Sequence, residues 1–290
     1  MLPSSLQQAL ARELGQPVVE TRPVSGGDIN QAAWCRLADG REMLVKWNTG
    51  RLPGLFTCEH RGLALIRATR TLTAPEVFAA AEADGDRPAF IALEWLGRGR
   101  SRPDTAVALG RGLAAMHRHT AETYGLDHDN YIGANPQPNT PADNWVDFFR
   151  HRRLGFQMEL AARNGYLPAA RRQRLERLLS RLEEWLPPHP PASLLHGDLW
   201  GGNWLVTASG EPALIDPAVY YGHREADLAF TELFGGFPPD FYRAYEEAWP
   251  LEPGYEERRH LYNLYHLLNH LNLFGEAYGG QVDAILRRYT

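Results

Sequence analysis

Apolar and polar residues alternate with a period of two through the first third of the chain, and with a helical period through the rest. From Val18 to Leu96 the alternation is clearest in 42–47 and 89–95, with glycine and proline between the runs. This pattern predicts a small antiparallel sheet. The segment Thr57–Arg70 interrupts it with helical spacing, and Thr57 is a candidate N-cap. A further amphipathic helix is expected in Met1–Leu14.

Beyond residue 97 the helical period predominates. A short glycine-rich stretch, 97–101, predicts a flexible connection, and five helical segments are expected after it, at 105–119, 144–163, 169–186, 241–248 and 256–274. Two short apolar runs, 204–207 and 213–216, predict a hairpin within this helical part. The fold class is therefore α+β and bilobal. A small N-terminal antiparallel β lobe with one helix, 1–97, precedes a larger and mainly α C-terminal lobe, 98–290.

Composition narrows the class of protein. The 290 residues are 44% hydrophobic and 22% charged, which is typical of a globular protein that buries about three quarters of its unfolded surface. A net charge of −5 gives no electrostatic footprint for nucleic acid, and no apolar run is long enough for a membrane span. The two cysteines, Cys35 and Cys58, are too few for a disulfide framework. We therefore expect a soluble, cytoplasmic protein.

The segment 194–205 contains an acidic motif with a recognisable spacing. His196, Asp198 and Asn203 follow the pattern His-x-Asp-x-x-x-x-Asn, which is typical of a kinase catalytic loop. Phosphoryl transfer needs a carboxylate to accept the proton of the attacking hydroxyl, and an oxygen ligand for a metal bound to the phosphates. Asp198 is the expected base and Asn203 an expected Mg²⁺ ligand. On its own, His-Gly-Asp would fit an ordinary tight turn equally well.

A second acidic residue makes the kinase interpretation more specific. Asp216 follows the apolar run 213–215 at the end of the predicted hairpin, where the metal-binding Asp of a kinase would lie. Carboxylate and amide oxygens are hard ligands that suit Mg²⁺. Together Asp198, Asn203 and Asp216 favour catalysis over turn capping.

The N-terminal lobe contains matching candidates for the nucleotide. Gly26 and Gly27 lie in a turn that could bring backbone N–H groups close to phosphate, although an ordinary hairpin turn is the alternative. Lys46 lies in an apolar strand and Glu59 early in the predicted helix, and an ion pair between them would direct the ammonium at the phosphates. At the end of the last strand, main-chain groups near Glu94 and Leu96 are expected to meet adenine.

Several longer stretches resemble one family. They are 25–31, 45–48, 214–229, 232–237 and 264–274, and in these residues the chain is similar to the fructosamine (ketosamine) kinases. The resemblance covers nearly the whole chain. It implies a bilobal fold related to aminoglycoside phosphotransferases, with ATP as phosphoryl donor. Some family members carry a cysteine in the glycine turn where this chain has Asp28, so thiol control at that turn is not expected here.

The resemblance also implies the acceptor. Family members phosphorylate ketosamines, such as fructosamine or ribulosamine, either free or on protein lysines, and the phosphorylated adduct then falls apart. The implied role is deglycation by an ATP- and Mg²⁺-dependent enzyme, which we expect to be a monomer. Two alternatives stay open: a kinase for another hydroxylated amine, such as an aminoglycoside or choline, and a nucleotide-binding pseudokinase scaffold. The scaffold would be indicated by loss of Lys46, Asp198, Asn203 or Asp216, and all four are present.

The remaining candidates concern the substrate pocket. Trp200, inside the catalytic loop, is placed to pack against a sugar or its amine-bearing tail. His266, Asn269 and His270 are polar groups in an otherwise apolar helix and could hydrogen-bond sugar hydroxyls. Packing is the favoured alternative for the two histidines, and a metal site is not expected of them. The basic run 150–153 predicts a solvated face, and Asp227 is expected to start a helix and brace the catalytic loop.

Overall fold

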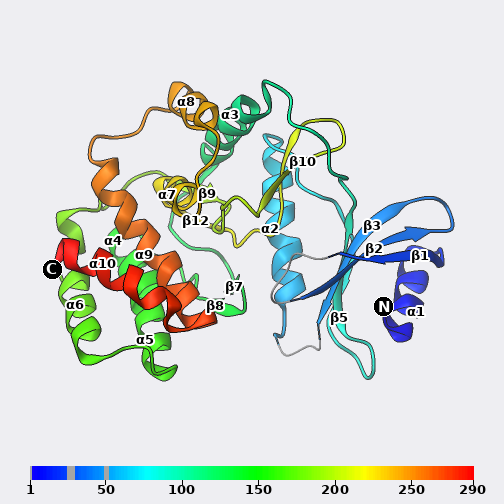
Figure 1. Cartoon of the computed structure of the whole chain (residues 1–290), viewed down its shortest axis with the longest axis horizontal. Coiled ribbons are helices and arrows are strands. Elements are labelled where there is room, and N and C mark those ends of the chain that lie inside the picture. The colour runs from blue at the N-terminus through cyan, green and yellow to red at the C-terminus, as the bar shows by residue number, and fades with distance from the viewer. Residues whose placement is uncertain (1, 25–29, 49–51) are drawn as a thin grey trace. The chain divides into compact units, whose positions relative to one another are not determined.

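The computed structural model describes residues 2–24, 30–48 and 52–290 (Figure 1). The predicted phosphate-contacting residues Gly26 and Gly27 lie outside the described residues. Contacts divide the chain into two compact units. The first comprises Met1–Thr105 together with Leu205–Asp216, and the second comprises Ala106–Trp204 together with Pro217–Thr290.

The first unit is built on a five-stranded antiparallel sheet with the strand order β1-β2-β3-β5-β4. Its elements are α1 (Ser4–Leu14), β1 (Val18–Pro23), β2 (Gln31–Leu37), β3 (Glu42–Asn48), α2 (Leu55–Thr69), β4 (Val77–Ala81) and β5 (Ala89–Glu94). The predicted period-two runs are therefore strands, and the order of the sheet follows the chain except that β5 lies between β3 and β4.

The two helices of this unit cover opposite faces of the sheet (Figure 1). Successive side chains of a strand point to opposite faces. Val45 therefore packs in the apolar cluster that includes Leu6 and Leu10 of α1, while the next residue, Lys46, reaches Glu59 of α2. Thr57 does not cap α2 as predicted. The helix begins two residues earlier, at Leu55 after Gly54, and the Thr57 hydroxyl donates to the Glu82 carboxylate.

A hairpin of β10 (Trp204–Val206) and β11 (Pro212–Leu214) joins the first unit despite its late position in the chain. The amide N–H of Ala208 donates to the Leu96 carbonyl, and a Cβ added at Gly99 would lie 2.2 Å from the Thr207 carbonyl oxygen. The glycines that predicted a flexible connection are thus required for close packing of two backbones. The predicted hairpin at 204–216 is confirmed.

The second unit is mainly helical. Its helices are α3 (Thr105–His117), α4 (Trp145–Phe148), η1 (Phe149–Gly155), α5 (Phe156–Arg163), α6 (Ala169–Leu179), η2 (Leu182–Glu184), α7 (Glu225–Leu233), α8 (Pro239–Ala248), α9 (Tyr255–Phe274), η3 (Glu276–Tyr278) and α10 (Gly279–Tyr289). Its short strands are β6 (Thr120–Ala121), β7 (Asn130–Ile132), β8 (Asn135–Gln137), β9 (Ala192–Leu195) and β12 (Tyr220–His223). Helix α10 and all of these strands were not predicted from the sequence. The predicted helix 144–163 is interrupted by the π-helical turn η1.

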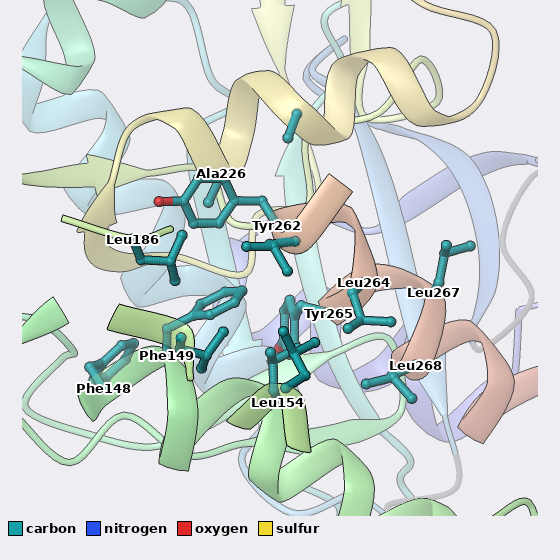
Figure 2. Close-up of a cluster of buried hydrophobic side chains, with 14 of the residues drawn as sticks. Phe148, Phe149, Leu154, Leu186, Ala226, Tyr262, Leu264, Tyr265, Leu267 and Leu268 are labelled. Atoms are coloured by element: carbon teal, nitrogen blue, oxygen red, sulfur yellow. The ribbon is translucent and has the colours of Figure 1, made fainter. Parts of the chain in front are cut away.

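Helix α9 is the centre of the second unit's core. Tyr262, Leu264 and Leu268 of this helix pack with Phe149 and Leu154 of η1 (Figure 2). Polar residues are buried as well, and α9 exposes only a small part of its surface. Of the helices that the structure describes, none combines the length and the apolar character needed to cross a bilayer.

Candidate active site

The loop after β9 folds back on itself through one pair of side chains. The Asn203 side-chain amide donates to the Asp198 carboxylate (Nδ2 to Oδ2, 2.8 Å) and to the Asp198 backbone carbonyl, also at 2.8 Å. A tight turn between them is closed by the Asn203 N–H, which donates to the Trp200 carbonyl. The spacing of the motif therefore brings the predicted base and the predicted metal ligand into direct contact.

Gly197 lets this loop lie against a second backbone segment. Its φ is +80°, which disfavours a side chain, and a Cβ there would lie 2.0 Å from the Ala218 carbonyl oxygen. The Ala218 N–H donates to the His196 carbonyl at 2.9 Å. The glycine of His-Gly-Asp is therefore required by a close approach of the chain, beyond the needs of a simple turn.

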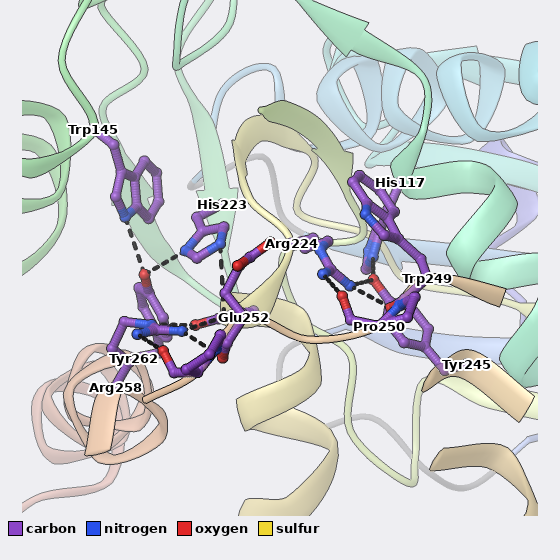
Figure 3. Close-up of polar contacts among 12 residues, drawn as sticks. His117, Trp145, His223, Arg224, Tyr245, Trp249, Pro250, Glu252, Arg258 and Tyr262 are labelled. Atoms are coloured by element: carbon purple, nitrogen blue, oxygen red, sulfur yellow. Dashed lines mark hydrogen bonds and ion pairs between the residues drawn. The ribbon is translucent and has the colours of Figure 1, made fainter. Parts of the chain in front are cut away.

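Asp227 braces the loop, as the sequence indicated. Its carboxylate accepts the backbone N–H groups of His196 (2.7 Å) and Gly197 (2.9 Å), immediately before Asp198. The side chain of His117, in α3, approaches the same carboxylate at 3.2 Å through Nε2. Its Nδ1 lies 2.8 Å from the Tyr245 hydroxyl (Figure 3). A carboxylate can only accept, so Nε2 carries the proton of the neutral ring.

Burial explains why the His117 ring is neutral. It is fully buried, and burial lowers the pKa of His117 although Asp227 opposes the shift. Tyr245 therefore donates to Nδ1, and its own oxygen accepts from Arg224. This run of hydrogen bonds connects α3, α7 and α8 behind the catalytic loop, and sequence reasoning found only its Asp227 end.

A second buried polar cluster lies near the first (Figure 3). The Trp145 indole N–H donates to the Tyr262 hydroxyl at 3.2 Å, and Tyr262 in turn lies 2.7 Å from His223 Nδ1. Arg258 forms a two-pronged ion pair with Glu225, whose carboxylate is fully buried. These contacts fix the start of α7 on α9, and so hold the helix that carries Asp227.

In the first unit, Lys46 forms the predicted ion pair with Glu59 and a second ion pair, with Asp216, that was not predicted. Its ammonium lies 2.8 Å from the Glu59 carboxylate and also contacts the Asp216 carboxylate. Burial by itself would lower the pKa of Lys46, but Asp216 and Glu59 outweigh it and raise that pKa above its ordinary value. Burial raises the pKa of Glu59, opposed by Lys46. Lys46 is therefore a fixed positive charge at any physiological pH.

Asp216 has an unusual backbone. It lies just beyond β11 with a φ of +53°, a left-handed conformation that is uncommon for a residue other than glycine. Aspartate and asparagine tolerate this region better than most residues because their side chains bond locally. Such a conformation costs on the order of 1–3 kcal/mol and is found preferentially at functional sites.

The donor chemistry of these residues fits Mg²⁺. Within the described ranges, no group of three or more His, Cys, Asp or Glu side chains could hold a metal ion. Mg²⁺ is commonly bound by one or two protein oxygens plus substrate phosphates, so a dedicated protein cage is not required. The Asp216 carboxylate and the Asn203 amide oxygen are donors of the required kind.

The predicted adenine-contacting residues are engaged in pairing at the end of β5. The Glu94 N–H donates to the Glu76 carbonyl, and the Glu94 carboxylate accepts the Glu76 N–H at 3.2 Å. The Leu96 carbonyl is occupied by Ala208. The strand end is therefore held by Glu76, just before β4, and by the hairpin.

Trp200 lies on the surface of the catalytic loop, and 40% of it is exposed. Its ring covers the backbone of Gly202, because a Cβ added there would lie 2.4 Å from two ring atoms. The neighbouring Gly201 has open space at the same position. The indole is thus supported on one side by the loop itself.

The three predicted polar residues of α9 differ in their surroundings. His266 stacks on Phe230 with ring centroids 3.5 Å apart, and burial lowers its pKa well below the ordinary value. The Asn269 amide oxygen accepts from Asn135 (2.8 Å) and Gln157 (3.2 Å), so its side chain is already engaged. His270 is half-buried among aromatic rings, and its Nδ1 donates to the His266 carbonyl, which leaves Nε2 as an acceptor.

One interpretation of the basic run 150–153 is wrong. Arg153 is completely buried, whereas a solvated face was predicted. Its guanidinium donates to the Pro138 carbonyl (2.7 Å) and the Asn139 amide oxygen (2.8 Å), and lies 3.8 Å from the centroid of the Tyr220 ring. The π-helical turn η1 changes the helical phase of this segment, which the assumption of a regular helix could not reveal.

Comparison with known proteins agrees with this arrangement. A family model described as fructosamine kinase matches residues 2–290. A protein of Synechocystis sp. described as a probable ketoamine kinase is 41% identical over 98% of this chain and 95% of its own length. The chloroplastic protein-ribulosamine 3-kinase of Arabidopsis thaliana is 40% identical over 92% of this chain and 81% of its own.

Solved structures extend the comparison. A crystal structure described as a fructosamine-3-kinase, from Thermobifida fusca, has a TM-score of 0.88 at 32% identity and covers 98% of this chain and 97% of its own. A spectinomycin phosphotransferase shares the fold alone, with a TM-score of 0.59 at 13% identity over 94% of this chain and 87% of its own. The α+β, protein-kinase-like fold predicted from the sequence is thus confirmed. From its sequence and its structure alike, the chain belongs to the fructosamine kinase family.

Proposed function

We propose that this enzyme transfers the γ-phosphoryl group of ATP to a hydroxyl of a ketosamine, with Mg²⁺ as the metal. The observation that carries the proposal is the Asp198–Asn203 pair, held by two 2.8 Å hydrogen bonds in a loop that Asp227 braces. A carboxylate held in this way is suited to accept the proton of an attacking hydroxyl. Lys46, with its raised pKa, supplies the cation for the phosphates.

The chain's residues have separate roles in the transfer. The acceptor oxygen forms the new O–P bond, Asp198 takes its proton, and the bond from phosphorus to the ADP oxygen breaks. Asn203 and Asp216 would hold Mg²⁺, which supplies charge neutralisation at the phosphates. We propose that Lys46, held by Glu59, binds the phosphates, and that Gly26 and Gly27 approach them through backbone N–H groups. Since the Glu94 N–H and the Leu96 carbonyl are already paired, we propose that the other main-chain groups of these two residues meet adenine.

This assignment extends to the two predicted lobes. Residues 1–97 would bind the nucleotide, and residues 98–290 would carry catalysis and the acceptor. We further propose that the enzyme acts as a monomer in the cytoplasm. Light scattering of the purified protein measures its oligomeric state, and cell fractionation measures its location.

The acceptor pocket is proposed to combine one aromatic surface with polar groups of α9. Trp200 would pack against the sugar or its amine-bearing tail, and His270 Nε2 would accept a hydroxyl. His266 and Asn269 are buried, at 3% and 2% exposure, so they contribute to the wall through their packing and amide contacts. A polar wall of this kind penalises acceptors that leave its groups unpaired.

The descriptions of the relatives favour ketosamines as acceptors. The Synechocystis protein is described as a ketoamine kinase and the Arabidopsis protein as a protein-ribulosamine 3-kinase. We propose that fructosamine or ribulosamine, free or on glycated protein lysines, is the acceptor here. Phosphorylation turns a hydroxyl into a leaving group, so the expected consequence is breakdown of the adduct and release of the amine.

A panel of acceptors tests this proposal. ADP release is followed with synthetic fructosamine, ribulosamine, choline and an aminoglycoside, each with and without Mg²⁺, and the products are examined by mass spectrometry for one added phosphoryl group. The expected result is Mg²⁺-dependent phosphorylation of a ketosamine. Faster phosphorylation of choline or the aminoglycoside than of every ketosamine would overturn the acceptor assignment. No transfer to any acceptor, with nucleotide still bound, would favour the pseudokinase scaffold.

A further inference from the structure

A buried set of amide side chains lies directly behind the catalytic loop. Asn130 and Gln137 belong to the hairpin β7–β8, and they donate to two successive backbone carbonyls, Val219 (2.8 Å) and Ala218 (3.0 Å). Both side chains are at least 95% buried. The carbonyls of residues 218–219 are therefore held by two side-chain donors rather than by pairing with a strand.

The same segment touches the loop that carries the base. The Ala218 N–H donates to the His196 carbonyl, and the Ala218 carbonyl lies against Gly197 so closely that no Cβ fits. Any shift of Ala218 must therefore shift His196 and Gly197, and with them Asp198. The Asp227 carboxylate holds this loop by accepting the N–H groups of His196 and Gly197. The Ala218 N–H holds it by donating to the His196 carbonyl.

Each amide in the set has a fixed orientation, because its partners allow only one. The Tyr265 hydroxyl donates to Gln137 Oε1 (2.6 Å), so Gln137 Nε2 must face Ala218. Asn130 receives Gln137 and Asn139 on Oδ1, both at 2.8 Å, so its Nδ2 must face Val219.

Arg153 closes the network at its far end. It donates to the Asn139 amide oxygen, which forces the Asn139 N–H₂ toward Asn130. The Arg153 cation lies over the rings of Tyr220 and Tyr265, with distances of 3.8 and 5.5 Å to their centroids. Two runs of hydrogen bonds thus lead through the amides to the two backbone carbonyls, one from Arg153 and one from Tyr265. A buried network in which each amide has one orientation specifies one geometry.

We propose that Asn130 and Gln137 are positioning residues for phosphoryl transfer, which set the place of Asp198 through residues 218–219 and the His196 carbonyl. The inference rests on the proposed function. A general base that is displaced by about 1 Å can cost on the order of 100-fold in rate, whereas binding of substrates at other contacts is little affected. The effect of losing the network is therefore expected in kcat rather than in KM.

The test compares variants of the full-length enzyme. Gln137→Met keeps the length of the side chain but removes all three of its hydrogen bonds. Asn130→Ala removes the bond to Val219 and the oxygen that accepts from Gln137 and Asn139. The matched control is Asp283→Asn, which weakens a buried contact with Arg171 in the same unit and touches neither segment 196–198 nor segment 218–219. Melting temperature, kcat, and KM for ATP and for the acceptor are measured for each, well below the lowest melting temperature.

We expect kcat to fall about 10- to 100-fold in Gln137→Met and Asn130→Ala, with both KM values within about threefold of wild type. Asp283→Asn should have a lower melting temperature than the wild type but the same kcat. Unchanged kcat in both network variants, with lowered melting temperatures, would overturn the inference and leave a purely structural role. If Gln137→Met does not fold, Tyr265→Phe decides, because it removes the hydroxyl that donates to Gln137 and keeps the ring that Arg153 contacts. Wild-type kcat in that variant counts against the proposal.

Failure of the proposed function gives a different result. If the wild-type enzyme phosphorylates no ketosamine, the acceptor assignment is wrong, and the same variants are compared in the hydrolysis of ATP to ADP and phosphate without acceptor. Loss of hydrolysis at unchanged KM for ATP would still support the positioning role, and unchanged hydrolysis would overturn it.

Discussion

The Asn203 amide holds the Asp198 carboxylate at 2.8 Å, so the predicted metal ligand also orients the predicted base. The amide can give its N–H₂ to Asp198 and still offer its oxygen to a metal. The two functions are therefore coupled through one planar group, and a change at Asn203 is expected to affect both turnover and metal dependence.

Replacing the base gives the most direct test of catalysis. Asp198→Asn is expected to lower turnover about 10²- to 10⁴-fold, the usual contribution of a positioned general base, with nearly unchanged ATP affinity. Steady-state kinetics and nucleotide titration measure the two quantities. Turnover near that of wild type would exclude Asp198 as the base.

The metal assignment predicts an order of effects. Asp216→Asn removes the charge, and asparagine is compatible with the left-handed backbone at this position. Asn203→Ala removes only a dipole. Asp216→Asn should therefore raise the Mg²⁺ concentration for half-maximal activity more than Asn203→Ala does. Asn203→Ala should in addition lower kcat at saturating Mg²⁺, because Asp198 loses the hydrogen bond from the Asn203 amide. A magnesium titration of each variant measures this, and wild-type metal dependence in Asp216→Asn would place the metal elsewhere.

The position of the Trp200 ring can be tested with a pair of neighbouring glycines. In Gly202→Ala the new methyl would displace the ring, whereas in Gly201→Ala it meets open space. If the indole packs against the acceptor, Gly202→Ala should raise the acceptor KM by about fivefold or more, at unchanged KM for ATP, by losing roughly 1 kcal/mol of aromatic contact. Equal acceptor KM values in the two variants would argue that Trp200 does not touch the acceptor.

Stability is expected to decrease on mild acidification. Burial lowers the pKa values of His117, His223 and His266, so the unfolded chain binds protons near pH 6.5 that the folded chain does not. The free energy of unfolding should therefore fall as the pH drops below about 6.5, by up to roughly 1.4 kcal/mol per pH unit for each histidine.

Urea unfolding at pH 7.5, 6.5 and 5.5 measures this dependence. The control is His266→Phe, which preserves stacking on Phe230 and removes one titrating group, so its pH dependence should be weaker. An unfolding free energy that is constant over this range would mean that the buried rings are protonated in the folded protein.

Sequence periodicity predicted the β lobe and the principal helices well, because their apolar positions repeat over many residues. The motif spacing predicted that Asp198 and Asn203 share one short loop, but their direct hydrogen bond was found only in the structure. The positions of Lys46 in a strand and of Glu59 in a helix predicted an ion pair between them, and the two side chains lie 2.8 Å apart.

Other parts depend on contacts that no local pattern contains. His117 reaches Asp227 across 110 positions of the chain, and Gln137 reaches Ala218 across 81. Neither residue stands out in its own segment. Arg153 was misassigned for a different reason, because charge is a good guide to exposure only where the helix has regular geometry and the interior offers no polar partners.

The π-helical turn at Phe149–Gly155 has a consequence for aligning relatives. Such a turn is an α-helix that has gained one residue, and the helices on either side, α4 and α5, keep their own packing faces. A relative that is one residue shorter between positions 149 and 155 would then differ in helix geometry rather than in loop length. In that relative a different side chain would occupy the place of Arg153, and the amide network would need another cation or none. A one-residue gap here is therefore expected to coincide with exchanges at positions 130, 137 and 139.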